Sequence, residues 1–192
     1  ITDDFRGISI SPVLSKVFEH CVLDRYGNFL ITSDNQFGFK KSVGCSHAIY
    51  SARSIIDNYV AGGSTVNICA LDISKAFDQM PHIGLYLNLM RRNVPLNVLS
   101  VFEHWFKNCY TCVKWVSALS GFFKLRCGVH QGGVLSPQFF AAYIEDLVSK
   151  VIEQHSGCYM KCKCVCIILY ADDILLLSPS VESLQKLFLC CE

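Results

Sequence analysis

The sequence predicts an α+β fold, in which a mixed or antiparallel β-sheet has helices packed on one face. Helical and strand-like segments follow one another without the regular alternation of a doubly wound sheet. The glycine-rich loops G-x-G-x-x-G and G-x-x-x-x-G-K-[ST], which bind nucleotides in such sheets, do not occur. With 192 residues and 52% hydrophobic composition, the chain is large enough to bury one substantial core.

Apolar residues at helical spacing predict six helices. Ser11 and Pro12 are a natural N-cap and first residue for the first helix, and Ser136 and Pro137 are the corresponding pair for a later, long one. The predicted helices cover residues 11–30, 47–60, 81–93, 96–109, 136–155 and 181–192.

Segments that alternate and are rich in β-branched residues predict the strands. These segments cover residues 65–73, 111–129 (a hairpin with a Ser-Gly turn), 158–170 and 174–180.

Two adjacent aspartates, Asp172 and Asp173, stand between the last two predicted strands, and Asp72 stands near the end of the first. Neighbouring carboxylates repel one another, and burying them beside apolar strands is costly unless a cation neutralises them. If these strands pair, the three carboxylates converge at one edge of the sheet. Oxygen ligands favour Mg²⁺ or Mn²⁺ over zinc, and two such ions form a common centre for phosphoryl transfer.

Twelve cysteines are scattered along the chain, many at apolar positions, which is typical of reduced thiols. Cys158, Cys162, Cys164 and Cys166 lack the paired C-x2-C spacing of structural zinc sites, so packing is the preferred interpretation. There is no signal peptide and no apolar run long enough to cross a membrane, so we expect an intracellular protein of the cytoplasm or nucleus. The net charge of +1 excludes only a strongly basic arm.

Three ordered motifs, ALDISKAFD, GVHQGGVLSP and YADD, resemble motifs A, B and C of reverse transcriptases. FRGISISPVLSKVFEHCVLDR and NQFGFKKSVGCSHAIYSARSII resemble the family's two fingers motifs, and the details are most similar to the non-LTR (LINE-type) retrotransposon branch. The resemblance implies a right-hand polymerase with fingers at 1–65, palm at 66–109 and 129–192, and a hairpin returning to the fingers at 110–128. It also implies that the thumb is absent, and the missing initial Met suggests a piece of a longer reading frame.

The resemblance assigns catalytic roles to the acidic residues. It implies that Asp72 and Asp172 are the principal ligands of two Mg²⁺ ions, or of Mn²⁺, with help from the Ile73 carbonyl and support from Asp173. It implies that Phe77 is a steric gate, whose ring occupies the space of a ribose 2′-hydroxyl and so selects dNTPs. Packing of this ring beneath a strand is the structural alternative.

The resemblance also implies contacts with nucleotide and template. The nucleotide contacts fall on Arg6, Lys16, Gln131 and Gly132, and the template contacts on Lys40, Lys41, Ser136 and Pro137. His130 departs from the family, because relatives commonly carry Arg or Lys at its position, and a neutral imidazole binds phosphate more weakly.

The activity implied by the resemblance is RNA-templated DNA synthesis, in which a primer 3′-hydroxyl attacks the α-phosphate of a dNTP. The implied partners are an RNA template, a DNA primer, dNTPs and the rest of a retrotransposon polyprotein, including an endonuclease and the thumb. Two alternatives stay open: a reverse transcriptase of the group II intron type, and a catalytically inactive relic of a retroelement.

Overall fold

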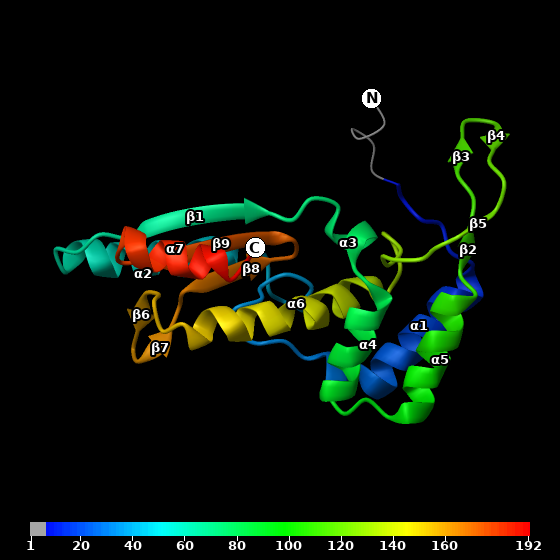
Figure 1. The fold of residues 1–192 in the computed structure, drawn as a ribbon, viewed down its shortest axis with the longest axis horizontal. Helices are drawn as coiled ribbons and strands as arrows, with labels where there is room; N and C mark the ends of the chain where they lie inside the picture. The colour runs from blue at the N-terminus through cyan, green and yellow to red at the C-terminus, as the bar shows by residue number, and fades with distance from the viewer. Residues whose placement is uncertain (1–6) are drawn as a thin grey trace. The chain divides into compact units, whose positions relative to one another are not determined.

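The structure is a computed structural model that describes residues 7–192 (Figure 1). The chain forms two compact units, each assembled from segments that are distant in the sequence. The first contains the described residues up to Ile31 together with Lys75–Tyr143, and the second contains Thr32–Ser74 together with Ile144–Glu192. No helix among residues 7–192 is long and apolar enough to span a lipid bilayer.

The second unit is built around a three-stranded antiparallel sheet with the strand order β1-β9-β8 (Figure 1). Its strands are β1 (Asn67–Asp72), β8 (Ile167–Tyr170) and β9 (Asp173–Ser178). The predicted strand at 158–170 is interrupted, because a short hairpin of β6 (Tyr159–Met160) and β7 (Lys163–Cys164) precedes β8.

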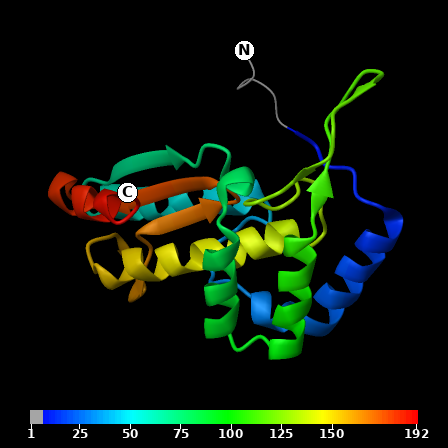
Figure 2. The same cartoon turned by 45° about the vertical axis from the view of Figure 1, so that its right-hand side comes forward.

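Helices cover both faces of this sheet, whereas the sequence predicted one covered face. The views in Figures 1 and 2 show α2 (Cys45–Ala61) and α7 (Val181–Leu189) on opposite sides of the strands. The reason lies in β8, where residues 167–169 are all buried. Because successive strand residues point to opposite faces, an unbroken buried run requires cover on both sides. On the α2 side, Ile55 and Leu177 belong to one buried apolar cluster.

The first unit is mainly helical. Its helices are α1 (Val13–Tyr26), the 3-10 helix η2 (Gly27–Leu30), α3 (Ala76–Gln79), α4 (His82–Arg91), α5 (Leu96–Lys107) and the first turns of α6 (Ser136–Glu153). Arg92, the C-cap residue of α4, connects this helix to η2 and α6. Its guanidinium donates hydrogen bonds to the carbonyl oxygens of Phe29 at 3.3 Å, Ile31 at 2.8 Å and Ala142 at 3.3 Å.

Both helix starts predicted at a Ser-Pro pair are shifted by one residue. Pro12 rather than Ser11 is the N-cap of α1, and it offers no side-chain capping bond. Helix α6 begins at Ser136 itself. The acceptor for its first turn comes from elsewhere in the chain: the buried carboxylate of Glu19 accepts a hydrogen bond from the Leu135 N–H at 2.9 Å.

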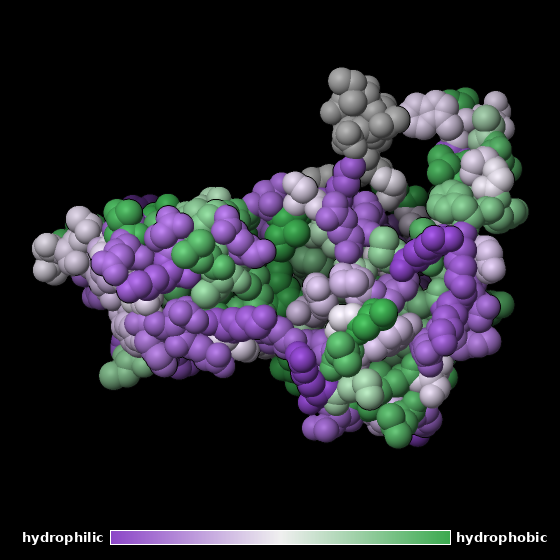
Figure 3. All heavy atoms as spheres, in the orientation of Figure 1, coloured by the Kyte–Doolittle hydropathy of each residue, from purple (hydrophilic) through white to green (hydrophobic). Residues whose placement is uncertain are grey.

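A β-ribbon leaves the first unit between α5 and the loop that precedes α6 (Figure 1). Its turn lies at residues 116–117 rather than at the predicted Ser120-Gly121. The turn falls there because Ser120 pairs across the ribbon with Val113 through two hydrogen bonds of 2.9 Å. Its strands are β2 (Tyr110–Thr111), β3 (Lys114–Trp115), β4 (Ala118–Leu119) and β5 (Phe123–Lys124). The ribbon exposes the large side chains of Trp115, Val116, Leu119 and Phe122. Figure 3 shows green, hydrophobic atoms on its surface.

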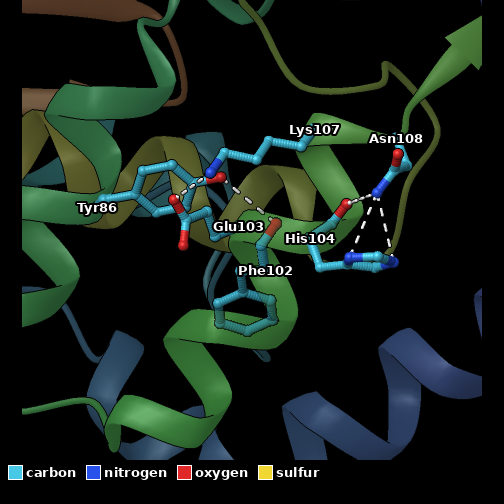
Figure 4. Close-up of polar contacts among 6 residues, drawn as sticks. All are labelled: Tyr86, Phe102, Glu103, His104, Lys107 and Asn108. Carbon is cyan, nitrogen blue, oxygen red and sulfur yellow. Dashed lines mark hydrogen bonds and ion pairs between the residues drawn. The ribbon is translucent and has the colours of Figure 1, made fainter.

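Helices α4 and α5 meet through Tyr86, whose hydroxyl donates a hydrogen bond to the Phe102 carbonyl at 3.4 Å (Figure 4). Burial, followed by the negative charge of Glu103, raises the pKa of Tyr86 to about 12. Glu103 is itself paired with Lys107 on the exposed side of α5, at 2.6 Å.

We expect alkaline pH to destabilise the protein through Tyr86. Its pKa is about 12 when folded, against an ordinary value of 10.0, so the folded state binds more protons between these values. The free energy of unfolding therefore falls as pH rises from 10.0 toward about 12. Tyr86→Phe removes this titration, and its urea midpoint should decline less over that range. Tyr110→Phe, the same substitution at an exposed ring, is the matched control. An unchanged slope in Tyr86→Phe would contradict the assignment.

Candidate active site

Two aspartates face each other across the end of the three-stranded sheet. Asp72 is the last residue of β1, Asp173 is the first residue of β9, and the antiparallel register pairs them directly. Tyr170, the last residue of β8, lies opposite Asp173 on its other side. Directly opposed residues project from the same face, so these three side chains share the face that α2 covers. The predicted pairing of the strands that carry the acids is confirmed.

Asp172 lies in the two-residue turn between β8 and β9. Its neighbour Ala171 has a φ of 61°, a conformation that costs a residue other than glycine about 1–2 kcal/mol. Among residues 7–192, the non-glycine residues with positive φ include Ala171 and not Asp172. A positive φ at the first loop position alone is the pattern of a type II′ turn, where glycine usually stands first. The backbone is therefore strained directly beside a predicted catalytic carboxylate.

A groove opens on the α2 face of the sheet, next to the paired aspartates. Its volume is about 520 Å³, and Asp72, Tyr170 and Asp173 are among the residues that line it. Its walls are largely apolar, with Ile56 from α2 and Leu175 from β9 among them. The groove arises because α2 sits over β8 and leaves the adjacent face of β1 partly exposed. A polymer end or a nucleotide could therefore approach the carboxylates from this side.

The donor set at this edge suits a hard divalent cation, but the side chains do not converge on a common point. Among residues 7–192, no three His, Cys, Asp or Glu side chains are arranged closely enough to hold a metal ion. Asp72 and Asp173 are exposed and Asp172 is half-buried, so their rotamers are not locked by packing. An all-carboxylate set with a backbone carbonyl beside it is the ligand type that Mg²⁺ takes. The ligand types at this edge therefore suit the predicted Mg²⁺. Strand pairing brings Asp72 and Asp173 close together.

The predicted nucleotide contacts on α1, on α3 and in the loop before α6 belong to the first unit. Phe77, in the short helix α3, stacks on Phe140 with ring centroids 5.0 Å apart and an interplanar angle of 25°. Gln131 lies in the loop before α6, and its carbonyl accepts a hydrogen bond from the Ser9 N–H at 2.8 Å. Gly132 follows it and is exposed. Lys16 is exposed on α1, and Arg6 lies outside the described residues.

The predicted template residues are divided between the two units. In the second unit, the Lys40 ammonium donates a hydrogen bond to the Ser33 carbonyl, and Lys41 is exposed. In the first unit, Ser136 is buried and Pro137 is half-buried at the start of α6. These positions leave Lys41 the more accessible of the two lysines.

Sequence reasoning also singled out His130, which lies in the loop before α6. Burial lowers the pKa of His130, and this effect is opposed by the nearby carboxylate of Glu19. Its Nε2 lies 3.4 Å from the Cys109 sulfur. Burial therefore favours the neutral imidazole at this position.

Hydrogen bonds hold the turn of motif A to the loop of motif B within the first unit. The Gly128 N–H donates to the Met80 carbonyl and the Val129 N–H donates to the Phe77 carbonyl, both at 2.8 Å. Gly128 has a φ of +80°, and a Cβ there would lie 2.6 Å from the Asp78 carbonyl oxygen. The position of Phe77 therefore depends on a glycine about fifty residues later in the chain.

Sequence reasoning missed two buried polar residues that support these motifs. One is Glu19, the acceptor at the start of α6. The other is Gln36, which is fully buried and whose carboxamide reaches the turn that contains Asp172. A glutamine in a glycine-punctuated loop gives no sign of burial, so only its place within a recognised motif could have drawn attention to it.

Comparison with known families decides the identity of the fold. The family model described as "Reverse transcriptase (RNA-dependent DNA polymerase)" matches residues 2–192. The chain belongs to the reverse transcriptase family. The resemblance inferred from the sequence motifs is thereby confirmed.

The similar curated proteins come from retrotransposable elements. A "Probable RNA-directed DNA polymerase from transposon X-element" of Drosophila melanogaster is 29% identical over 150 residues, covering 74% of this chain and 16% of that protein. A "Retrovirus-related Pol polyprotein from type-1 retrotransposable element R2" of Nasonia vitripennis is 26% identical over 181 residues, covering 94% and 18%. This reverse transcriptase chain thus spans less than a fifth of the length of these relatives, and the predicted non-LTR resemblance is confirmed.

Solved structures support the fold. Apo telomerase from Candida tropicalis superposes with a TM-score of 0.65 at 14% identity, over 92% of this chain and 36% of that one. At this identity the likeness concerns the fold alone. It agrees with a mixed α/β reverse transcriptase fold containing small antiparallel sheets.

Gly128→Ala should destabilise the protein. The new Cβ meets only backbone atoms, from Phe77 and Asp78, in a conformation that already disfavours alanine. We expect the free energy of unfolding to fall by roughly 2–4 kcal/mol in urea titrations. Gly121→Ala is the matched control, because a Cβ there meets no atom within 4 Å, and it should change stability by less than about 0.5 kcal/mol. Equal stability of the two variants would contradict the tight approach at Gly128.

Proposed function

We propose that this chain is the nucleotide-polymerising part of an RNA-directed DNA polymerase. The observation that carries the proposal is the register of β1 and β9, which sets Asp72 opposite Asp173, with Asp172 in the adjoining turn. The family match over residues 2–192 supports reading this acidic edge as a polymerase centre. Within this proposal the strands around the acids are the palm, residues 1–65 are the fingers, and the hairpin at 110–128 returns to the fingers.

Asp72 and Asp172 would hold two Mg²⁺ ions together with the Ile73 carbonyl, and Asp173 would support them. Asp172 comes from a strained turn, whereas Asp72 and Asp173 come from regular strands. When bound, the ions would lower the pKa of the primer hydroxyl and neutralise charge on the leaving pyrophosphate. Mn²⁺ has the same oxygen preference and would substitute.

The reaction proposed is attack by the primer 3′-oxygen on the α-phosphorus of a dNTP. A new P–O bond forms, the bond to the β-phosphate oxygen breaks, the hydroxyl proton passes to solvent and pyrophosphate leaves. The groove beside Tyr170 and Asp173 is a suitable approach for the primer end, because its apolar walls limit competing water. We assign the triphosphate to Arg6, Lys16, Gln131 and Gly132, whose donors would offset the charge that develops on phosphate oxygens.

The template proposed is RNA, and the remaining partners are a DNA primer, dNTPs and the rest of a retrotransposon polyprotein. The template contacts assigned to this chain are Lys40, Lys41, Ser136 and Pro137. The relatives from the X-element and R2 favour the retrotransposon branch over the group II intron alternative.

Primer extension on poly(rA)/oligo(dT) with Mg²⁺, using the full reading frame that contains this chain, tests the proposal. Asp172→Asn combined with Asp173→Asn should lower kcat by about 1,000-fold or more, because the ligands that hold the ions are lost. Asp57→Asn is the matched control, since Asp57 is an exposed carboxylate on α2 that lies 3.6 Å from the Arg53 guanidinium. Extension that survives the double substitution would refute the metal assignment. An inert wild-type frame would favour the inactive-relic alternative.

Phe77→Val should relax discrimination between dNTPs and rNTPs. If the ring blocks a ribose 2′-hydroxyl, its truncation should lower the ratio of kcat/KM for dTTP over UTP by about 100-fold. Phe140→Val removes the ring that stacks on Phe77. This control variant distinguishes a packing role of Phe77 from a role in excluding the 2′-hydroxyl. The ratio should change much less in that variant. An equal change in both would support the packing alternative for Phe77.

A further inference from the structure

Gln36 is a fully buried polar residue in the loop that precedes α2. Its side-chain oxygen accepts hydrogen bonds from the Gly38 N–H at 2.7 Å and the Ala171 N–H at 3.2 Å. Its side-chain nitrogen donates to the Ala171 carbonyl at 3.4 Å. A single carboxamide thus satisfies both backbone polar groups of Ala171, the residue directly before Asp172.

The loop that carries Gln36 is fixed to β8 by its own backbone. The Phe37 N–H donates to the Leu169 carbonyl and the Leu169 N–H donates to the Asn35 carbonyl, both at 2.8 Å. The Asn35 side chain adds a bond to the Ile167 carbonyl at 2.8 Å. Residues 35–37 therefore run beside β8 like a short parallel strand, with a bridge between Gln36 and Leu169.

Close approach of the loop to the turn requires a glycine. A Cβ on Gly38 would lie 2.4 Å from the Ala171 nitrogen and 3.0 Å from the Gln36 side-chain oxygen. Real Cβ atoms do not come so near to backbone, so any other residue here would push the loop away from the turn. The carboxamide would then lose its reach to Ala171.

These contacts explain how Ala171 holds a positive φ. Regular pairing between β8 and β9 ends at Tyr170 and Asp173, so the ladder gives the turn residues no partners. An alanine in the left-handed region is disfavoured by about 1–2 kcal/mol, and it persists only where its surroundings determine it. Gln36 provides those surroundings by matching a donor and an acceptor to the two polar groups of Ala171.

We propose that Gln36 is a positioning residue for the catalytic turn: it fixes the backbone of Ala171 and thereby the direction of Asp172. It does not touch substrate or ion. The inference rests on the proposed function, because it assigns Asp172 to the reaction. It goes beyond that function by naming a residue from a distant loop, 135 positions before Ala171, that sets the geometry of the acid.

Gln36→Met tests the proposal in the full-length polymerase, since it keeps the length of the side chain and removes both polar atoms. We expect kcat for primer extension to fall about 10–100-fold and the Mg²⁺ concentration for half-maximal rate to rise about 3–10-fold. The KM for dTTP should stay within about twofold, because the proposal gives Gln36 no contact with the nucleotide. Direct Mn²⁺ binding, followed by electron paramagnetic resonance without substrate, should weaken in parallel.

Two controls separate positioning from general stability. Asn35→Ala removes the neighbouring bond to β8 without touching the turn, so it should lower stability and leave the Mg²⁺ half-saturation unchanged. Gln185→Met changes an exposed glutamine on α7 and should leave both quantities unchanged. The positioning role is refuted if Gln36→Met behaves like Asn35→Ala, that is, if it lowers stability and leaves the Mg²⁺ half-saturation and the Mn²⁺ affinity unchanged.

A rescue experiment gives a second and independent readout. Glycine adopts positive φ without penalty, so Ala171→Gly should reduce the need for Gln36. In the Gln36→Met background, Ala171→Gly should restore the Mg²⁺ half-saturation toward the wild-type value. No restoration would contradict the proposal. If Gln36→Met does not fold, Gln36→Glu serves the same comparison, because it keeps the acceptor and loses the donor to the Ala171 carbonyl. An inactive wild type would refute the proposed function instead.

Discussion

The antiparallel pairing of β1 with β9 is the interaction on which the candidate site depends. It runs from Asn67 opposite Ser178 to Asp72 opposite Asp173, so it brings a residue from motif A beside one from motif C. Opposed like charges weaken a strand pair, whereas the apolar pairs behind them, such as Leu71 with Ile174, strengthen it. The acids can be tolerated because they occupy the exposed end of a ladder whose interior is apolar. The same arrangement leaves them accessible to a cation.

The turn beside that ladder shows how a strained backbone is maintained. The strands alone fix Asp72 and Asp173, but they provide no hydrogen-bond partners for Ala171. The carboxamide of Gln36 supplies them from a loop that is itself bonded to β8. The candidate catalytic edge is therefore assembled from three separate stretches of sequence, all of them in the second compact unit.

The sequence predicted the helices and strands whose residues follow a regular short-range pattern. Helical spacing located the six predicted helices to within a few residues but not the one-turn helix α3, and the strand around Asp72 was found because β-branched residues alternate there. Features set by long-range partners were missed. The turn at residues 116–117 follows from Ser120 pairing with Val113, the start of α6 uses Glu19 from 116 positions earlier, and Gln36 acts on Ala171. Family motifs pointed to the acidic residues. No sequence pattern pointed to Glu19 or Gln36, the buried residues that support the motifs.

We propose that the edge formed by Asp72, Asp172 and Asp173 holds the catalytic ions of an RNA-directed DNA polymerase. The most direct test is anomalous diffraction from crystals of the full polymerase with Mn²⁺, primer–template and a non-hydrolysable dNTP. We expect anomalous peaks roughly 2.0–2.3 Å from carboxylate oxygens of Asp72 and Asp172. Peaks elsewhere in an otherwise ordered complex, with these carboxylates free of metal, would contradict it.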